Sequence, residues 1–234
     1  MLIRRVEERQ ASVTPVVVVL LLVVLSVVGV AAPARASIGT RAARGPAGAG
    51  QWLAVTATSH TSTYASLIAY RRARGRWVRV FGPWRARVGY NGIARPGAKR
   101  EGDGRTPAGT YALGFFFGVR PDPGVAFPYR RAHSYDVWDD DPASPRYNEW
   151  VDRRHHNPGR YPEPMDQQPA YEYAAVIRYN VSRVPGLGSA IFLHVGTGSA
   201  TAGCVSLPLH ELLKILRWLR PHASPRITIR VAAG

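Results

Sequence analysis

The sequence predicts a mainly β fold, a sandwich or barrel of short strands with one helix packed on it near the C-terminus. Short segments rich in Val, Ile, Thr and aromatic residues recur along the chain, separated by Gly, Pro or polar residues. One stretch near the end instead carries leucine at three- and four-residue spacing. Many short strands with turn signals between them are typical of sandwiches and barrels.

The predicted strands share this composition. They are residues 52–58, 64–72, 76–82, 109–118, 171–180, 190–195, 204–207 and 226–232. The helix is predicted within residues 207–221, between Pro208 in its first turn and Pro221 after its end. Its leucines form one apolar stripe that can lie against a sheet.

A long irregular insertion is predicted between Gly118 and Pro169. Prolines, "WDDDPASPRYNEW" and "YPEPM" replace the strand pattern there. A loop of this size in a compact domain is more often functional than idle, because substrate-facing elements tend to be loops on a rigid scaffold.

The N-terminus predicts export. Arginines precede an apolar run from Val16 to Ala32, and "ARA" at 34–36 fits the small-x-small cleavage pattern. We therefore expect a signal peptide over residues 1–36, with an uncleaved membrane anchor as the alternative because the run is at the lower limit for a span. A flexible Gly-rich linker is predicted for residues 37–50, followed by the folded domain at 51–234.

The chain is strongly basic, with a formal net charge of +16. Such a charge favours polyanionic surroundings, which means nucleic acid for a cytosolic protein and anionic wall polymers for an exported one. Because the N-terminus predicts export, we expect a location in the cell wall or outside the cell, and no nucleic-acid partner.

The only cysteine, Cys204, follows His194 by ten positions. His194 ends an apolar strand, and a Gly/Ser/Thr loop returns the chain to Cys204, so the two side chains can meet across neighbouring strands. An imidazole beside a thiol can take its proton and make a nucleophilic thiolate. Gly203 lets the backbone turn so that consecutive amides face a developing oxyanion.

On these residues alone, two other interpretations have to be weighed: a structural role in the core and a metal site. His194 and Cys204 are both compatible with a buried core, and on spacing alone that interpretation leads. A metal site is disfavoured because there is no second cysteine and the remaining histidines lack ligand spacing.

The segment resembles the active-site motif of the L,D-transpeptidase catalytic domains (the YkuD family) of bacterial cell-wall enzymes. Those domains carry a histidine on one strand and Ser/Thr-x-Gly-Cys at the start of the next, matched here by His194 and by "TAGC" at 201–204. Further similar segments are "YNG" at 90–92, "KREGDGRTPAGTY" at 99–111, "WDDDPASPRYNEWV" at 138–151, "YEYAAVIRYN" at 171–180 and "GSAIFLHV" at 188–195. Ala202 and Ser206 depart from the commoner motif, and the His-to-Cys spacing is shorter than usual.

This resemblance implies a mostly antiparallel β-sandwich and transfer of a peptidoglycan stem peptide. Cys204 attacks the carbonyl of the third residue of a donor tetrapeptide, D-alanine leaves, and an acceptor amine resolves the thioester. The implied roles are base for His194 and oxyanion donors for the Gly203 and Cys204 amides. A carbonyl in 195–198 or the Thr197 hydroxyl is a candidate to orient His194. No cofactor or metal is needed.

Several residues are candidates for substrate contact. Thr201 and Ser206 belong to the motif, and Tyr147, Asn148 and Trp150 are placed as pocket residues in the insertion. Glu163 or Asp140 could meet the amines of donor or acceptor. Two alternative functions remain, an L,D-carboxypeptidase that uses water as acceptor and a non-enzymatic basic module that binds the wall.

Overall fold

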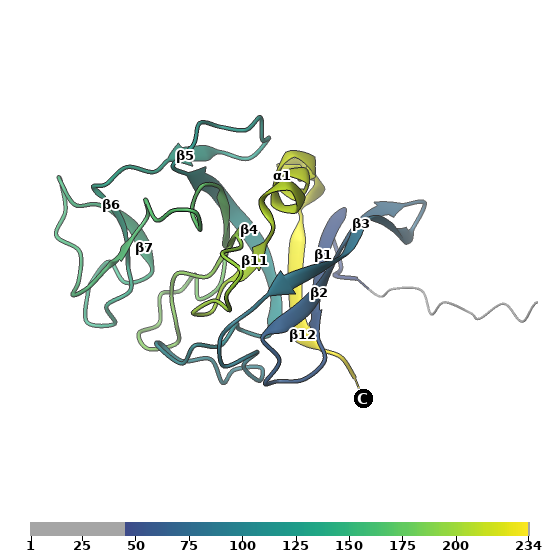
Figure 1. The fold of residues 1–234 in the computed structure, drawn as a ribbon, viewed down its shortest axis with the longest axis horizontal. Helices are drawn as coiled ribbons and strands as arrows, with labels where there is room; N and C mark the ends of the chain where they lie inside the picture. The colour runs from purple at the N-terminus through teal and green to yellow at the C-terminus, as the bar shows by residue number, and fades with distance from the viewer. Residues whose placement is uncertain (1–44, 234) are drawn as a thin grey trace, which may run out of the picture. The chain divides into compact units, whose positions relative to one another are not determined.

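A computed structural model describes residues 45–233, which form one large and one small sheet (Figure 1). The strands are β1 (Gln51–Ala57), β2 (Tyr64–Ala73), β3 (Arg76–Arg87), β4 (Gly109–Gly118), β5 (Tyr129–Arg131), β6 (Asp136–Asp139), β7 (Glu149–Asp152), β8 (Glu163–Pro164), β9 (Ala174–Ile177), β10 (Phe192–Val195), β11 (Val205–Leu207) and β12 (Arg226–Val231). The helix α1 spans Leu209–Trp218 and precedes the 3-10 turn η1 at Pro221–Ala223. The mainly β fold with one helix near the C-terminus is confirmed.

The predicted segment 1–36 and most of the predicted linker lie outside the described residues. Within the described part, Ala49 is buried, and Gly50 donates to the Ala223 carbonyl at 2.7 Å and accepts from the Arg72 amide at 2.8 Å. Residues 49–50 are therefore packed against the domain. Residues 45–233 contain no helix that is long and apolar enough to cross a bilayer.

The large sheet closes into a ring. Its strand order is β12-β1-β2-β3-β11-β10-β9-β4-β5, and β12 also pairs with β4. Most neighbours are antiparallel, but β12 with β1, β10 with β11, and β4 with β5 run parallel. The strands expected to form a sandwich or barrel thus belong to one continuous sheet. The pairing of β12 with β4 closes it into a ring, and β5 extends from the outer edge of β4.

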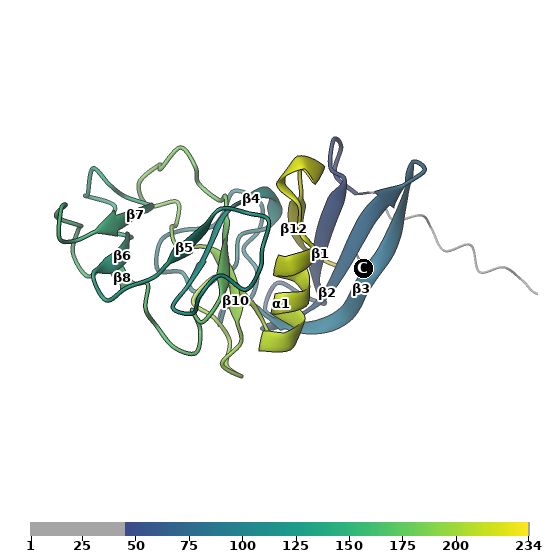
Figure 2. The same cartoon turned by 90° about the horizontal axis from the view of Figure 1, so that it is seen from above.

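The main core lies inside this ring. The strand β2 alternates buried and more exposed residues, as expected for a strand with one face toward a core. From α1, the residues Leu212, Ile215 and Leu216 are fully buried in the same cluster as the inward side chains of the ring strands. Figure 2 shows α1 between β1–β3 on one side and β4 and β10 on the other.

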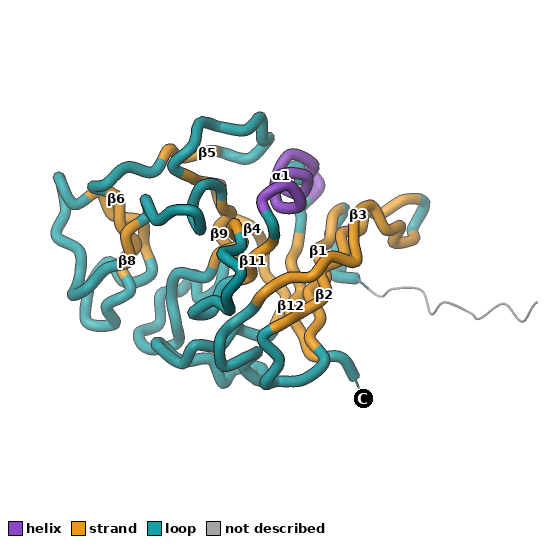
Figure 3. Tube along the Cα trace, in the orientation of Figure 1, coloured by secondary structure: helices purple, strands orange, loops and turns teal. Residues whose placement is uncertain are grey.

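The insertion is more regular than its sequence indicates. It contributes β5 to the large sheet, and β6, β7 and β8 form a separate three-stranded sheet in the order β7-β6-β8. Loops join these short strands and make up most of that end of the molecule (Figure 3). Strands of two to four residues are too short to show an alternating pattern, which is why the sequence predicts irregular structure here.

A second apolar cluster connects the insertion to the large sheet. It joins Trp138 and Met165 of the insertion to Phe117 of β4, Phe192 of β10 and Cys204. The predicted nucleophile therefore lies where the insertion packs on the ring.

Candidate active site

Two neighbouring parallel strands bring His194 and Cys204 together. The strands β10 and β11 pair with Leu193 opposite Val205 and His194 opposite Ser206. In this register Cys204 comes beside Phe192, two residues before His194, and so on the same face of the sheet. The connecting segment 196–204 is shorter than the dozen or so residues that usually join parallel strands, and its glycines permit the tight return.

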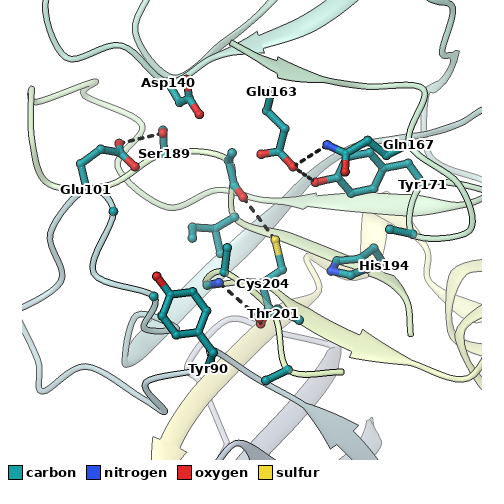
Figure 4. A pocket seen from close by; sticks show the side chains of 18 of the residues that line it. Tyr90, Glu101, Asp140, Glu163, Gln167, Tyr171, Ser189, His194, Thr201 and Cys204 are labelled. Carbon is teal, nitrogen blue, oxygen red and sulfur yellow. Dashed lines mark hydrogen bonds between the residues drawn. The ribbon is translucent and has the colours of Figure 1, made fainter. Parts of the chain in front are cut away.

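Cys204 and His194 line one cavity of about 360 Å³ (Figure 4). The walls come from the loops before β4, from the insertion, from the segment before β10 and from the loop 197–203. The polar side chains that line the cavity are those of Tyr90, Lys99, Glu101, Asp140, Glu163, Gln167, Tyr171, Ser189, His194, Thr197, Thr201 and Cys204.

The Cys204 thiol is nearly buried and holds two hydrogen bonds. The side chain is 7% exposed, and Sγ accepts from the Phe192 amide and donates to the Ala190 carbonyl, each at 3.3 Å. Burial raises the pKa of the thiol well above its usual range, and the charge of Glu163 raises it further, while the Phe192 amide and Lys99 oppose the shift. The resting side chain is therefore a neutral thiol.

His194 is held as a neutral base. Its Nδ1 lies 2.8 Å from the Val195 carbonyl, which can only accept, so Nδ1 carries the proton and Nε2 offers its lone pair. Burial lowers the pKa of the imidazole to about 4, although this hydrogen bond favours the charged form. The Tyr171 ring meets the imidazole edge to face at 5.7 Å. Among the candidate orienting groups, the backbone carbonyl of Val195 makes the contact.

Two threonine hydroxyls hold the backbone of Cys204. Thr201 Oγ1 donates to the Cys204 carbonyl at 2.7 Å, and Thr106 Oγ1 donates to the same oxygen at 3.1 Å. Thr106 in turn accepts from the Gly89 amide at 2.8 Å. Thr201 is therefore a positioning residue as well as a cavity residue.

The predicted oxyanion donor Gly203 is partly engaged. Its amide donates to Thr201 Oγ1 at 3.2 Å, a long hydrogen bond that an oxyanion can replace. A Cβ at this position would lie 3.1 Å from the Arg105 carbonyl and 3.2 Å from Ile191 Cδ1. Glycine thus permits the close approach of the chain just before Cys204. Within residues 45–233, no hydrogen bond joins Cys204 Sγ to His194.

Three carboxylates line the cavity. Burial raises the pKa of Glu163 to about 7, aided by the charges of Asp140 and Glu101, while hydrogen bonds from Tyr171 and Gln167 oppose the shift. Burial and the charge of Glu101 raise the pKa of Asp140 to about 6. The described residues hold no group of three or more His, Cys, Asp or Glu side chains arranged for a metal ion. This wall favours a cationic ligand.

The one lysine of the cavity is already paired. Lys99 is 5% exposed, and its Nζ donates to Asp103 Oδ1 at 2.7 Å and to the Arg100 carbonyl at 2.6 Å. Lys99 therefore leaves most of the negative charge of the carboxylates uncompensated.

Three other predicted site residues, Tyr147, Asn148 and Trp150, make their polar contacts within the protein. The Tyr147 hydroxyl donates to Glu101 and accepts from the Gly188 amide. Asn148 Oδ1 accepts from the Ala190 amide at 3.2 Å, and Trp150 Nε1 donates to Asp136 at 3.0 Å. None of these three lines the cavity of Cys204. Because their polar groups are satisfied within the protein, they hold the insertion in place.

Ser206 is almost completely buried, at 1% exposed, and does not line the cavity either. Its Oγ has no hydrogen-bond partner among the described residues. Ser206 lies on β11, where it pairs with His194 of β10 on one side and with Arg87 of β3 on the other. Substrate contact by Ser206 stays a prediction, and this geometry gives it no support.

Sequence reasoning missed Tyr171, Thr106 and Glu101 as site residues. All three lie in segments that carry the family resemblance, but nothing in their local pattern marks them as polar groups of the site. The contacts that define them join positions far apart in the sequence, such as Thr106 with Cys204.

Three comparisons with known proteins bear on the family of this chain. A family model described as the L,D-transpeptidase catalytic domain, YkuD, matches residues 51–229. A search of curated proteins gives no match. Among solved structures, the chain is similar to the helical cell shape determining protein Pgp2 from Campylobacter jejuni, with 15% sequence identity and a TM-score of 0.37. The similarity covers 79% of this chain and 48% of that one.

The family match spans most of the chain and contains both His194 and Cys204. The description of that family model names an L,D-transpeptidase catalytic domain. The chain belongs to the YkuD family of L,D-transpeptidase catalytic domains.

Proposed function

We propose that this protein is an exported L,D-transpeptidase that cross-links peptidoglycan stem peptides through a thioester on Cys204. The observation that carries the proposal is the shared cavity of Cys204 and a His194 whose Nε2 is free to accept a proton. A thiol and a neutral imidazole on one face of two adjacent strands are the groups that thiol acyl transfer requires.

In the acylation step, Cys204 Sγ attacks the carbonyl of the third residue of a donor tetrapeptide. The thiol proton passes to His194 Nε2 as the bond forms, and the Gly203 and Cys204 amides stabilise the oxyanion. The tetrahedral intermediate then expels D-alanine, whose amine takes the proton from His194. The products are a thioester on Cys204 and free D-alanine.

Two acceptors can resolve the thioester. A side-chain amine of another stem gives a cross-link, whereas water gives the tripeptide of an L,D-carboxypeptidase. The carboxylates Glu101, Asp140 and Glu163 favour the first outcome, because they line the cavity and attract a cationic acceptor.

The test uses disaccharide-tetrapeptide as both donor and acceptor. We expect D-alanine release, a covalent adduct on the intact protein by mass spectrometry, and a cross-linked dimer. Cys204→Ala removes the nucleophile and should abolish all three products. Equal traces for the wild type and Cys204→Ala would refute the proposal.

Export is tested separately, on protein recovered from the envelope and the medium. We expect its mass to lack residues 1–36, in keeping with the cleavage pattern at Ala34-Arg35-Ala36. Recovery only as the full-length chain in the membrane fraction would favour the uncleaved anchor.

A further inference from the structure

Glu163 faces the cavity in a defined orientation. The Tyr171 hydroxyl and Gln167 Nε2 both donate to its Oε1, the latter at 3.3 Å. Among the hydrogen bonds of residues 45–233, none falls on Oε2. Figure 4 shows the carboxylate pointing into the cavity on the side of Cys204 away from Thr201.

Tyr171 connects Glu163 to the catalytic pair. Its hydroxyl bonds Glu163, and its ring packs edge to face on His194 and on Phe192. The tyrosine is buried, so this arrangement is held by the apolar cluster that also contains Cys204. The carboxylate is therefore placed by packing as well as by hydrogen bonds.

The second half of the reaction needs a group that the first half does not. An alkylamine has a pKa of about 10.4, so it reaches the cavity as an ammonium ion and cannot attack until it loses a proton. The pKa of His194 is lowered to about 4, which makes it a poor acceptor for that proton before the amine attacks. Water needs no such deprotonation. Without a second group that accepts the proton of the ammonium ion, hydrolysis of the thioester is therefore favoured over transfer to the amine.

We propose that Glu163 binds the ammonium group of the acceptor, takes one proton from it, and so directs the Cys204 thioester to the amine rather than to water. This inference rests on the proposed function and names the residue that selects the acceptor.

The step balances in atoms and charge. The ammonium gives one proton to the Glu163 carboxylate and becomes a neutral amine. The amine nitrogen attacks the thioester carbon, the carbon–sulfur bond breaks, and an amide forms. The second proton of the nitrogen passes through His194 Nε2 to the leaving Cys204 sulfur. Glu163 then returns its proton to solvent.

The surroundings of Glu163 suit it to this exchange. Burial and the carboxylates of Asp140 and Glu101 raise the pKa of Glu163 to about 7, and Tyr171 and Gln167 limit the rise. A carboxylate of raised pKa is a stronger base than an exposed one. The other charged or titratable groups at this cavity are Tyr90, Lys99, His194 and Cys204.

The test separates the two halves of the reaction in Glu163→Gln. Glutamine keeps the shape and an oxygen that accepts from Tyr171, but it removes the charge and the basicity. Glu172→Gln is the matched control, because Glu172 pairs with Arg120 and does not line the cavity. The full-length proteins are compared for the rate of adduct formation on Cys204 and for the ratio of dimer to tripeptide.

We expect adduct formation in Glu163→Gln to change less than about threefold and the dimer-to-tripeptide ratio to fall at least about tenfold. The control should match the wild type in both. In the wild type this ratio should rise with pH through about 7, and Glu163→Gln should lose that rise. An unchanged ratio, or a loss of adduct formation as large as the loss of dimer, overturns the inference and leaves the proposed function standing. Failure of the wild type to form any adduct overturns both.

Tyr171→Phe provides a second test if Glu163→Gln does not fold. It removes the hydroxyl that donates to Glu163 and keeps the ring that packs on His194. Loss of this donor raises the pKa of Glu163, so the pH midpoint of the product ratio should move upward. An unmoved midpoint contradicts the role of Glu163.

Discussion

At the scale of single residues, Cys204 and His194 are both kept uncharged in the resting protein. The thiol bonds a carbonyl and the imidazole is buried, so a thiolate–imidazolium pair is disfavoured until a substrate enters. Thiolates are oxidised far faster than thiols. A neutral resting thiol therefore suits the only cysteine of a protein that we expect to work outside the cell.

This arrangement predicts slow alkylation of Cys204. Because burial raises the pKa of the thiol, iodoacetamide should label the native protein near pH 7.5 at least about tenfold more slowly than the same chain unfolded in denaturant. The native rate should keep rising beyond pH 9, since the thiolate fraction still increases there. A plateau below pH 8, measured by intact mass, would contradict a neutral resting thiol.

Three of the predicted site residues share the cavity for a local reason. His194, Gly203 and Cys204 lie on adjacent strands and the loop between them, so a short stretch of chain carries the information. Tyr147, Asn148 and Trp150 depend on how the insertion folds back. Their partners are Glu101, Ala190 and Asp136, and no spacing in the sequence announces the contacts with Glu101 and Ala190.

At the scale of elements, Thr106 connects three segments of the site. Its hydroxyl accepts from the amide of Gly89, which lies just after β3, and donates to the carbonyl of Cys204, just before β11. The side chain is completely buried, so water cannot replace these bonds. A single hydroxyl thus couples the loops around β3 and β4 to Cys204.

Thr106→Val tests this coupling. Valine keeps the shape but leaves the buried Gly89 amide without an acceptor, which should lower the free energy of unfolding by about 1–3 kcal/mol. Adduct formation on Cys204 should slow as well, because the Cys204 carbonyl loses one of the two hydroxyls that donate to it. Denaturant unfolding and intact mass measure the two effects.

Thr106→Ser is the control, because it retains the hydroxyl and removes one methyl group. It should keep most of the stability and of the adduct rate. Equal stability of the valine and serine variants would mean that the hydroxyl does not hold the site.

The elements differ in how far the sequence predicted them. Strands of the ring such as β2 and β4, with ten residues each, show clear strand composition and were predicted close to their observed bounds. The helix α1 was equally easy to predict, because its leucines repeat at three- and four-residue spacing. The strands β6 to β8 have four residues or fewer and exist because they pair with one another, so no local signal marks them.

At the scale of the whole molecule, positive charge gathers on the hairpin of β2 and β3. This hairpin lies at the opposite end of the described domain from β6–β8 (Figure 2). Its exposed arginines are Arg71, Arg72, Arg74, Arg76, Arg79 and Arg85. None of these arginines lines the cavity that holds the carboxylates, so binding to the wall can be tested apart from catalysis.

Replacement of Arg72, Arg74 and Arg76 by Gln should weaken binding to isolated cell walls that carry anionic polymers. Exposed charges act over about 10 Å at 0.1 M salt, so binding of the wild type should fall as salt rises, and the triple variant should lose it at lower salt. Cosedimentation with walls over a salt series measures this. D-alanine release from soluble tetrapeptide should stay unchanged, because none of the three lines the cavity.

A second triple variant separates the hairpin from net charge. Arg120, Arg154 and Arg183 each pair with a carboxylate, so their replacement by Gln changes net charge equally but leaves the basic hairpin intact. Cys204→Ala should bind walls like the wild type while forming no adduct. If both triple variants weaken binding to the same extent, overall charge and not the hairpin holds the protein to the wall. If Cys204→Ala also retains D-alanine release, Cys204 is not the nucleophile, and a non-enzymatic module that binds the wall explains the protein's function better.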